Sequence, residues 1–113
     1  MEEGNFSEAI THLHLVDAAG KARPKDLWHL GCCYDQIGEL DKALRAYSRA
    51  LHLSPDSAEL RKNIASIHVR KGRALSLTDL REAREEFQKA LAIDPGNELA
   101  SAHLELTSQN ESF

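Results

Sequence analysis

The sequence predicts an all-α fold, a solenoid of antiparallel helical hairpins with about six helices. Gly4, Gly38 and Gly72 recur at intervals of 34 residues, the period of one type of helical repeat. The composition is 42% apolar, 5% aromatic and 28% charged, which suits amphipathic helices. No stretch alternates apolar and polar residues with the Val, Ile and Thr enrichment of strands. We expect each of the three glycines to end one helix before its antiparallel partner begins.

The first expected helix, 7–19, is the second half of a hairpin, because its small and apolar positions recur one period later. Gly4, Ala9, Leu13 and Val16 precede Gly38, Ala43, Tyr47 and Ala50 by 34 residues. No first helix covers this element, so residues 1–23 form a partial repeat. We therefore expect an apolar face that is left bare because the chain is a piece of a longer protein, or that associates with a partner or a second copy. This self-association face consists of Phe6, Ile10, Leu13 and Val16.

Residues 24–57 form one complete repeat, with helices expected at 24–37 and 41–53. Leu30, Gly31 and Tyr34 fit the pattern W-x2-L-G-x2-Y. Ala43, Tyr47, Ala50 and Pro55 then supply the small, aromatic, small and proline residues that follow in such a repeat. In these residues the chain resembles the tetratricopeptide repeat family. The resemblance implies a right-handed α-solenoid whose first helices line a concave surface for other proteins.

The second copy, residues 58–97, has helices expected at 58–71 and 78–93 and carries an insertion. Ala83, Phe87, Ala90 and Pro95 lie 40 residues, rather than 34, after their counterparts in the first copy. Six residues are therefore inserted near 73–78. Either the hairpin loop is longer and projects Leu75 and Leu77 as a contact, or the first helix gains a turn and these leucines pack between the helices.

The last expected helix, 98–109, belongs to a capping segment, 98–113, and completes a single domain of residues 1–113. Asp94-Pro95-Gly96-Asn97 is a turn sequence that separates this helix from the one before. Small residues at Gly31, Ala65 and the alanines of the second helices mark close helix crossings. Tyr47 and Phe87 are expected in the core.

Charge and composition exclude several classes of partner. The net charge is −4, which argues against a nucleic-acid surface or an anionic membrane surface. No apolar run reaches the length of a membrane helix, and Met1 to Asn5 lacks the features of a signal peptide. Cys32 and Cys33 are adjacent in a helix, where a mutual disulfide would be strained, so we expect reduced thiols and a cytoplasmic protein.

The candidate partner-binding residues are first-helix positions that the packing pattern does not require. They are Lys25, Trp28, Cys32, Asp35, Lys62, Asn63, Ser66, Arg70 and His103. An aromatic ring, an amide and basic groups could hold a peptide or helix that carries a carboxylate. The alternative is that Trp28 packs on the preceding helix and that Lys62 and Arg70 are ordinary solvated charges.

The resemblance also allows one family function to be tested. Co-chaperones of this family bind acidic chaperone tails through five Lys, Asn and Arg residues on three helices. Here Trp28 and Cys32 occupy the first pair of positions, Asn63 matches, and Leu99 and His103 replace the last pair. This sequence therefore disfavours such a clamp.

Catalytic, metal and cofactor sites are not expected. His29, Cys32 and Cys33 share a helix turn, but a structural zinc site needs four ligands and no other cysteine is present. Signatures of phosphate loops, dinucleotide sites and Ser-His-Asp triads are absent. The sequence therefore predicts a non-enzymatic adaptor or scaffold that binds a peptide or helix. The alternatives are a solenoid that self-associates through its N-terminal helix and a chaperone for an amphipathic segment.

Overall fold

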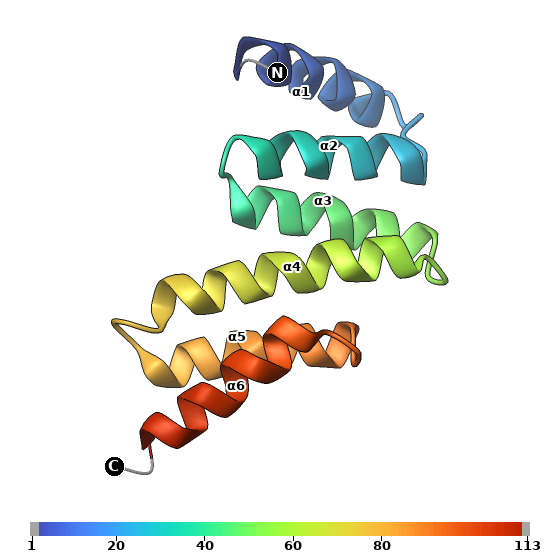
Figure 1. The fold of residues 1–113 in the computed structure, drawn as a ribbon. Coiled ribbons are helices and arrows are strands. Elements are labelled where there is room, and N and C mark those ends of the chain that lie inside the picture. Colours follow the sequence, from blue (N-terminus) through green and yellow to red (C-terminus); the bar gives the residue numbers. More distant parts are fainter. Residues whose placement is uncertain (1–2, 112–113) are drawn as a thin grey trace. The chain divides into compact units, whose positions relative to one another are not determined.

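A computed structural model describes the backbone of residues 3–111 and the side chains of residues 5–107 (Figure 1). Residues 3–111 form six helices and no strand, so the predicted all-α fold is confirmed. The helices are α1 (Glu3–Ala18), α2 (Pro24–Gln36), α3 (Leu40–Leu53), α4 (Ala58–Leu75), α5 (Leu80–Ile93) and α6 (Glu98–Glu111). The last two residues of the predicted capping segment lie outside the described residues.

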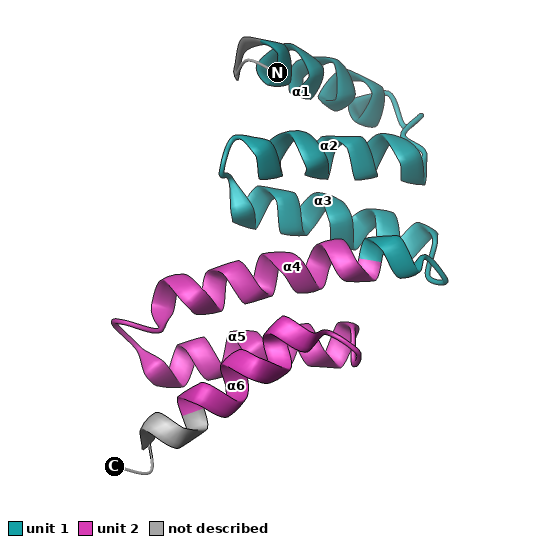
Figure 2. Cartoon of the chain, viewed as in Figure 1, with its two compact units in different colours: residues 1–60 teal, residues 61–113 magenta. Residues whose placement is uncertain are grey.

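The chain divides into two compact units, residues 1–60 and 61–113 (Figure 2). The first holds α1, α2, α3 and the first turn of α4, and the second holds the rest of α4 with α5 and α6. Within residues 3–111 we find no helix with both the length and the apolarity needed to cross a membrane.

In the first unit, α2 and α3 form a hairpin onto which α1 packs. The two helices approach closely at Gly31, because a Cβ atom there would lie 2.6 Å from Cδ1 of Tyr47. Tyr47 is 1% exposed, and only a residue without a side chain allows its ring to lie this close to the α2 backbone. Gly38 ends the hairpin turn with φ +83°, a conformation that favours glycine.

The inner face of α1 is covered, which corrects part of the predicted self-association face. Leu13 is 9% exposed and packs with Leu30 and Ala46, and Ile10 packs against the same cluster. The sequence suggested that these residues are bare because no helix precedes α1. In the structure, α2, which follows α1, covers Leu13 instead. Phe6, Ile10 and Val16 are partly exposed. Association through α1 stays a prediction that rests on these three residues.

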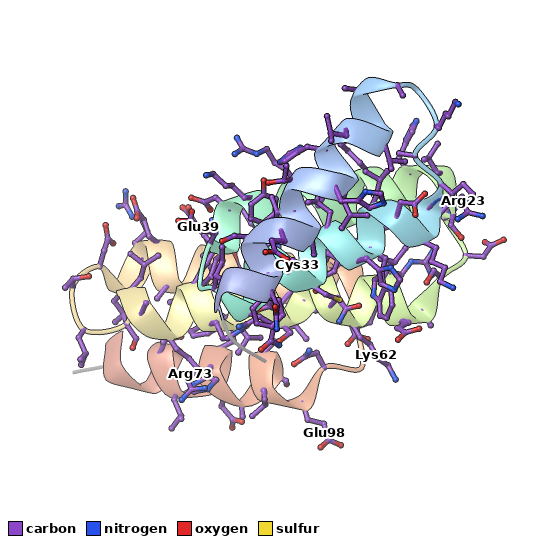
Figure 3. The ribbon with its side chains drawn as sticks, turned by 90° about the horizontal axis from the view of Figure 1, so that it is seen from above. Arg23, Cys33, Glu39, Lys62, Arg73 and Glu98 are labelled. Carbon is purple, nitrogen blue, oxygen red and sulfur yellow. The ribbon has the colours of Figure 1, made fainter. Side chains whose placement is uncertain are left out.

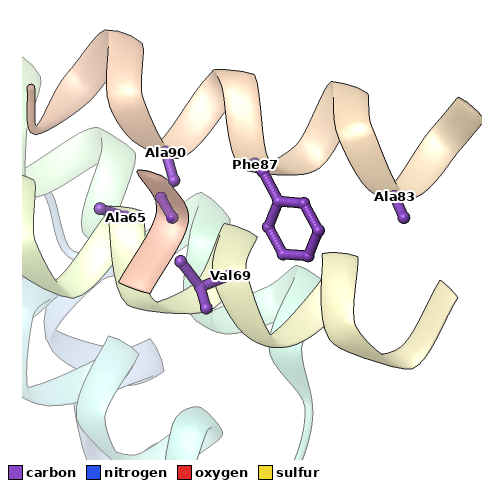
Figure 4. Packing of buried hydrophobic residues seen from close by; sticks show 6 residues of the cluster. Ala65, Val69, Ala83, Phe87 and Ala90 are labelled. Atoms are coloured by element: carbon purple, nitrogen blue, oxygen red, sulfur yellow. The ribbon is translucent and has the colours of Figure 1, made fainter. Parts of the chain in front are cut away.

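In the second unit, Phe87 is the centre of the core between α4 and α5. It is fully buried with Ala65, Val69, Ala83, Ala90 and Ala100 (Figure 4). Residues 81–90 of α5 are buried and exposed in the same order as residues 41–50 of α3. The 40-residue spacing inferred from the sequence therefore relates equivalent positions of the two helices.

The inserted residues mainly lengthen α4. This helix has 18 residues against 13 in α2, and it continues to Leu75, where residues 76–79 connect it to α5. Leu75 packs against the core of the second unit, whereas Leu77 is 95% exposed. The two leucines thus behave differently, one as the longer-helix interpretation expects and the other as a projecting side chain.

The positions of two repeat glycines differ from the prediction. Gly4 lies inside α1 and Gly72 inside α4, so neither ends its helix. A Cβ atom at Gly72 would lie 2.6 Å from Cε1 of Phe87. In the first unit the corresponding contact is made by Gly31, whose 34-residue counterpart is Ala65. The longer α4 therefore moves the close contact seven residues, two helical turns, towards the end of the helix.

Replacing Gly72 with alanine is expected to destabilise the protein by up to about 2 kcal/mol. Alanine gains up to about 1 kcal/mol of helix propensity, but its Cβ forces the Phe87 ring to move, at a cost of about 1–3 kcal/mol. Urea unfolding monitored by circular dichroism measures the difference. Gly96→Ala is the control, because no atom lies within 4 Å of a Cβ there. In a Phe87→Leu background Gly72→Ala should become neutral or stabilising, and an unchanged penalty would contradict the ring contact.

Candidate functional site

The start of α2 is fixed by a local cap that places Lys25 and Trp28. Pro24 occupies the first turn, and the backbone N–H of Arg23 donates to Oδ2 of Asp26 over 2.9 Å. This hydrogen bond lowers the pKa of Asp26. Arg23 and Glu39 mark the two ends of α2 in Figure 3.

Trp28 forms the aromatic wall of a cleft of about 200 Å³ at this end of the first unit. The ring is half-buried, and its centroid lies 5.1 Å from that of His29 at 41°. The other lining residues are Pro24, Lys25, Ser54, Ser57, Glu59 and Leu60. Ser57 also caps α4, because its Oγ accepts a hydrogen bond from the N–H of Leu60. The structure therefore brings the predicted residues Lys25 and Trp28 together in one cleft.

Cys32 lies on a second, mostly apolar cleft of about 390 Å³ between α1 and α2. The cleft is lined by Phe6, Ala9, His12 and Leu13 of α1 and by His29, Cys32, Cys33 and Gln36 of α2. Cys33 lies beneath α1 in the view of Figure 3. Burial raises the pKa of its thiol, which keeps it protonated and weakly reactive.

Cys32 and Asp35 differ in their packing. Tyr47 Oη donates to Cys32 Sγ over 3.4 Å, so this thiol is tied to the α2–α3 hairpin. Asp35 is half-buried near the end of α2. Among the described residues, no three His, Cys, Asp or Glu side chains are grouped so that they could hold a metal ion.

Four of the predicted binding residues lie on α4. Lys62 and Ser66 are exposed there, whereas Asn63 and Arg70 are half-buried. Their spacing of three, four and seven residues places them on one side of the helix. The binding role of these four residues stays a prediction.

His103 packs on the core of the second unit. Its ring stacks on that of Phe87, with centroids 5.1 Å apart and an angle of 11° between the planes. It is half-buried, so one side of the ring supports α5 from α6. This contact gives His103 a packing role that its predicted position in a first helix did not suggest.

A buried polar cluster in the second unit was not predicted. The Glu86 carboxylate is 8% exposed, and its Oε2 lies 3.0 Å from Nδ1 of His68. Its Oε1 lies 3.6 Å from Nζ of Lys71 and 3.8 Å from Nζ of Lys89. The first repeat has Ala46 and Tyr34 at the positions of Glu86 and His68. The two residues depart together from the repeat pattern, which is a signal that the sequence contained.

These features define a helical-repeat protein in which hairpins present partly exposed first helices. A family model described as tetratricopeptide repeat matches residues 29–57, and a second with the same description matches residues 65–97. Together they cover more than half of the 113 residues. The chain belongs to the tetratricopeptide repeat family. As a member of this family it is a protein-interaction module, a class that is generally non-enzymatic.

Several curated proteins are similar to this chain. Tetratricopeptide repeat protein 34 of Mus musculus is 30% identical over 84% of the chain, which spans 17% of that protein. Photosystem I assembly protein Ycf3 of Sorghum bicolor is 29% identical over 96% of the chain and 70% of its own length. The Ycf3 of Prochlorococcus marinus is 28% identical over 85% of the chain and 62% of its own length.

Among solved structures, one similar chain is the first TPR of Spaghetti (RPAP3) bound to the HSP90 peptide SRMEEVD. It is 22% identical with a TM-score of 0.40, and the match covers 80% of this chain and 94% of that one.

Proposed function

We propose that this chain is a non-enzymatic adaptor that binds a peptide or helix of a partner protein along the exposed side of α2 around Trp28. The observation that carries the proposal is the Trp28 cleft, in which an aromatic wall meets Lys25, Glu59 and two serine hydroxyls. Partly exposed tryptophans bordered by polar groups are typical anchors of protein interfaces.

The size of the cleft favours a side chain of a longer ligand. Pockets that hold a complete small molecule measure about 300–1,000 Å³, whereas the Trp28 cleft measures about 200 Å³. An apolar side chain of a bound peptide fits against the ring, and Lys25 and Glu59 on the rim can pair with flanking charges. Most of the affinity would then come from Trp28.

A selection of random displayed peptides on the full chain tests this proposal. Trp28 is the single tryptophan of the chain, so its emission reports binding at the cleft directly. We expect Trp28→Ala to weaken a selected peptide about thirtyfold, the equivalent of about 2 kcal/mol, by isothermal titration calorimetry. Leu15→Ala is the control, because it removes a large apolar side chain that is 66% exposed on α1 and does not line the Trp28 cleft. Peptides that bind wild type and Trp28→Ala equally would refute the site.

An acidic chaperone tail is a less favoured partner for this chain. Trp28 and Cys32 replace the basic and amide residues of the clamp's first pair, and His103 is stacked on Phe87. The peptide SRMEEVD therefore serves as a comparison ligand in the same titrations, and we expect it to leave Trp28 emission unchanged. A co-chaperone role would require saturable binding of this peptide.

A further inference from the structure

A basic pocket in the first unit is not explained by the proposed peptide site. It has a volume of about 230 Å³ and lies where α1, α2 and α3 meet. Its walls are His14, Tyr34, Lys42, Arg45 and Arg49, and its floor is formed by Leu30 and Ala46. We refer to it as the Tyr34 pocket.

The Tyr34 pocket and the Trp28 cleft use different faces of α2. Trp28 precedes Leu30, which lies on the floor of the Tyr34 pocket, by two residues. Two residues rotate a helix by about 200°, so these two side chains point to nearly opposite sides of α2. A ligand in one site therefore leaves the other site accessible.

Donors and positive charges converge on the pocket from three helices. His14 Nε2 lies 2.5 Å from Tyr34 Oη, which joins α1 to α2. Lys42 Nζ lies 5.8 Å from the centroid of the Tyr34 ring. Burial raises the pKa of the Tyr34 hydroxyl, and the charge of Arg45 opposes this shift. Glu39 adds an opposing charge near Tyr34 but does not line the pocket.

The wall at Arg49 already binds a carboxylate. Its Nη1 and Nη2 atoms donate to the two oxygens of Asp17 over 2.8 and 2.7 Å. The hydrogen bond from Arg49 lowers the pKa of Asp17, and the charge of His14 acts in the same direction. The lining therefore carries three basic side chains, Lys42, Arg45 and Arg49, of which Asp17 pairs with one, in a chain whose net charge is −4. With Arg49 engaged by Asp17, Lys42 and Arg45 are the cations through which the pocket can bind a further anion.

We infer that the Tyr34 pocket binds the phosphoryl group of a phosphorylated side chain in a partner protein. A phosphoryl group carries close to two negative charges and three strong acceptor oxygens, which match Lys42, Arg45 and the His14–Tyr34 pair. A carboxylate has one charge and two acceptor oxygens and would leave one of these groups without a ligand contact. Arginine clusters recognise phosphorylated motifs in the same way. The pocket volume fits one side chain of a peptide.

The test is a nuclear magnetic resonance titration of the full chain with a short blocked peptide of alanines around one phosphoserine. Comparison ligands are the same peptide with serine, the same peptide with glutamate, and inorganic phosphate. We expect the phosphopeptide to shift the amide signals of Tyr34, Lys42 and Arg45. The double variant Lys42→Gln/Arg45→Gln should weaken binding about tenfold or more.

A matched control separates a specific pocket from a general charge effect. Lys21→Gln/Arg81→Gln removes two exposed positive charges that line neither the Tyr34 pocket nor the Trp28 cleft. Binding that is retained in this control and lost in Lys42→Gln/Arg45→Gln supports the inference. Equal weakening in both variants, or equal binding of the glutamate peptide, would overturn it. Inorganic phosphate that binds as tightly as the phosphopeptide would show a small-anion site and would also overturn it.

Discussion

Replacing Phe87 with alanine is expected to lower the free energy of unfolding by about 3–5 kcal/mol. Phe87 is fully buried, lies against Gly72 of α4 and stacks with His103 of α6. Removing the ring loses the free energy of its transfer out of water. It also leaves a cavity that α4, α5 and α6 cannot fill by moving together. The free energy of unfolding of a small domain is about 5–15 kcal/mol, so this single change removes a large part of the stability. Urea unfolding followed by far-ultraviolet circular dichroism measures it.

Two further variants keep this prediction testable if Phe87→Ala does not fold. Phe87→Leu retains an apolar side chain and should cost only about 1–2 kcal/mol. Leu77→Ala removes an apolar side chain that is 95% exposed, and its effect should stay within about 0.5 kcal/mol. A Phe87→Leu protein as stable as the wild type would mean that the ring has no tight packing partners.

The core of both hairpins could be predicted because it depends on local spacing. The sequence identified Ala43, Tyr47 and Ala50 and then found Ala83, Phe87 and Ala90 at 40 residues. A helix buries one side, so residues at intervals of three and four become buried together whatever the partner is. All of these side chains are 1% exposed or less.

The glycine positions could not be assigned from spacing alone. Gly38 and Gly72 are one period apart, yet Gly38 supplies a positive φ in a turn and Gly72 allows a ring to approach a helix. Both functions require the absence of a Cβ atom, so the sequence shows the same residue for two different reasons. Which of the two functions Gly72 has depends on its position relative to Phe87, and the length of α4 sets that position.

In the candidate site, too, the residues within one helix could be predicted from the sequence, whereas contacts between helices could not. Lys25 and Trp28 were found because first-helix positions outside the packing pattern are exposed by default. The remaining walls of their cleft come from Ser54 to Leu60, and the loop after α3 brings these residues back to the start of α2. His103 was placed with the binding residues because its stacking partner, Phe87, is in another helix.

The second large loss of stability is expected from a change in the polar cluster around Glu86. Glu86→Ala is expected to destabilise the protein by about 1–3 kcal/mol, because it removes the acceptor that faces His68 and a carboxylate 3.6 Å from Nζ of Lys71. The His68 side chain is only 12% exposed, so water replaces the lost contact poorly. The contact between Glu86 and Lys89 adds little, since Lys89 is 59% exposed.

The double variant His68→Tyr/Glu86→Ala should recover more than half of the stability that Glu86→Ala loses. It installs in the second unit the pair that the first unit uses, Tyr34 and Ala46, which pack against one cluster there. Urea unfolding of the two single variants and the double variant gives the coupling free energy. Glu85→Ala is the matched control, because Glu85 is the exposed neighbour of Glu86. If the two single effects simply add, His68 and Glu86 are independent, and their joint departure from the repeat has no energetic basis.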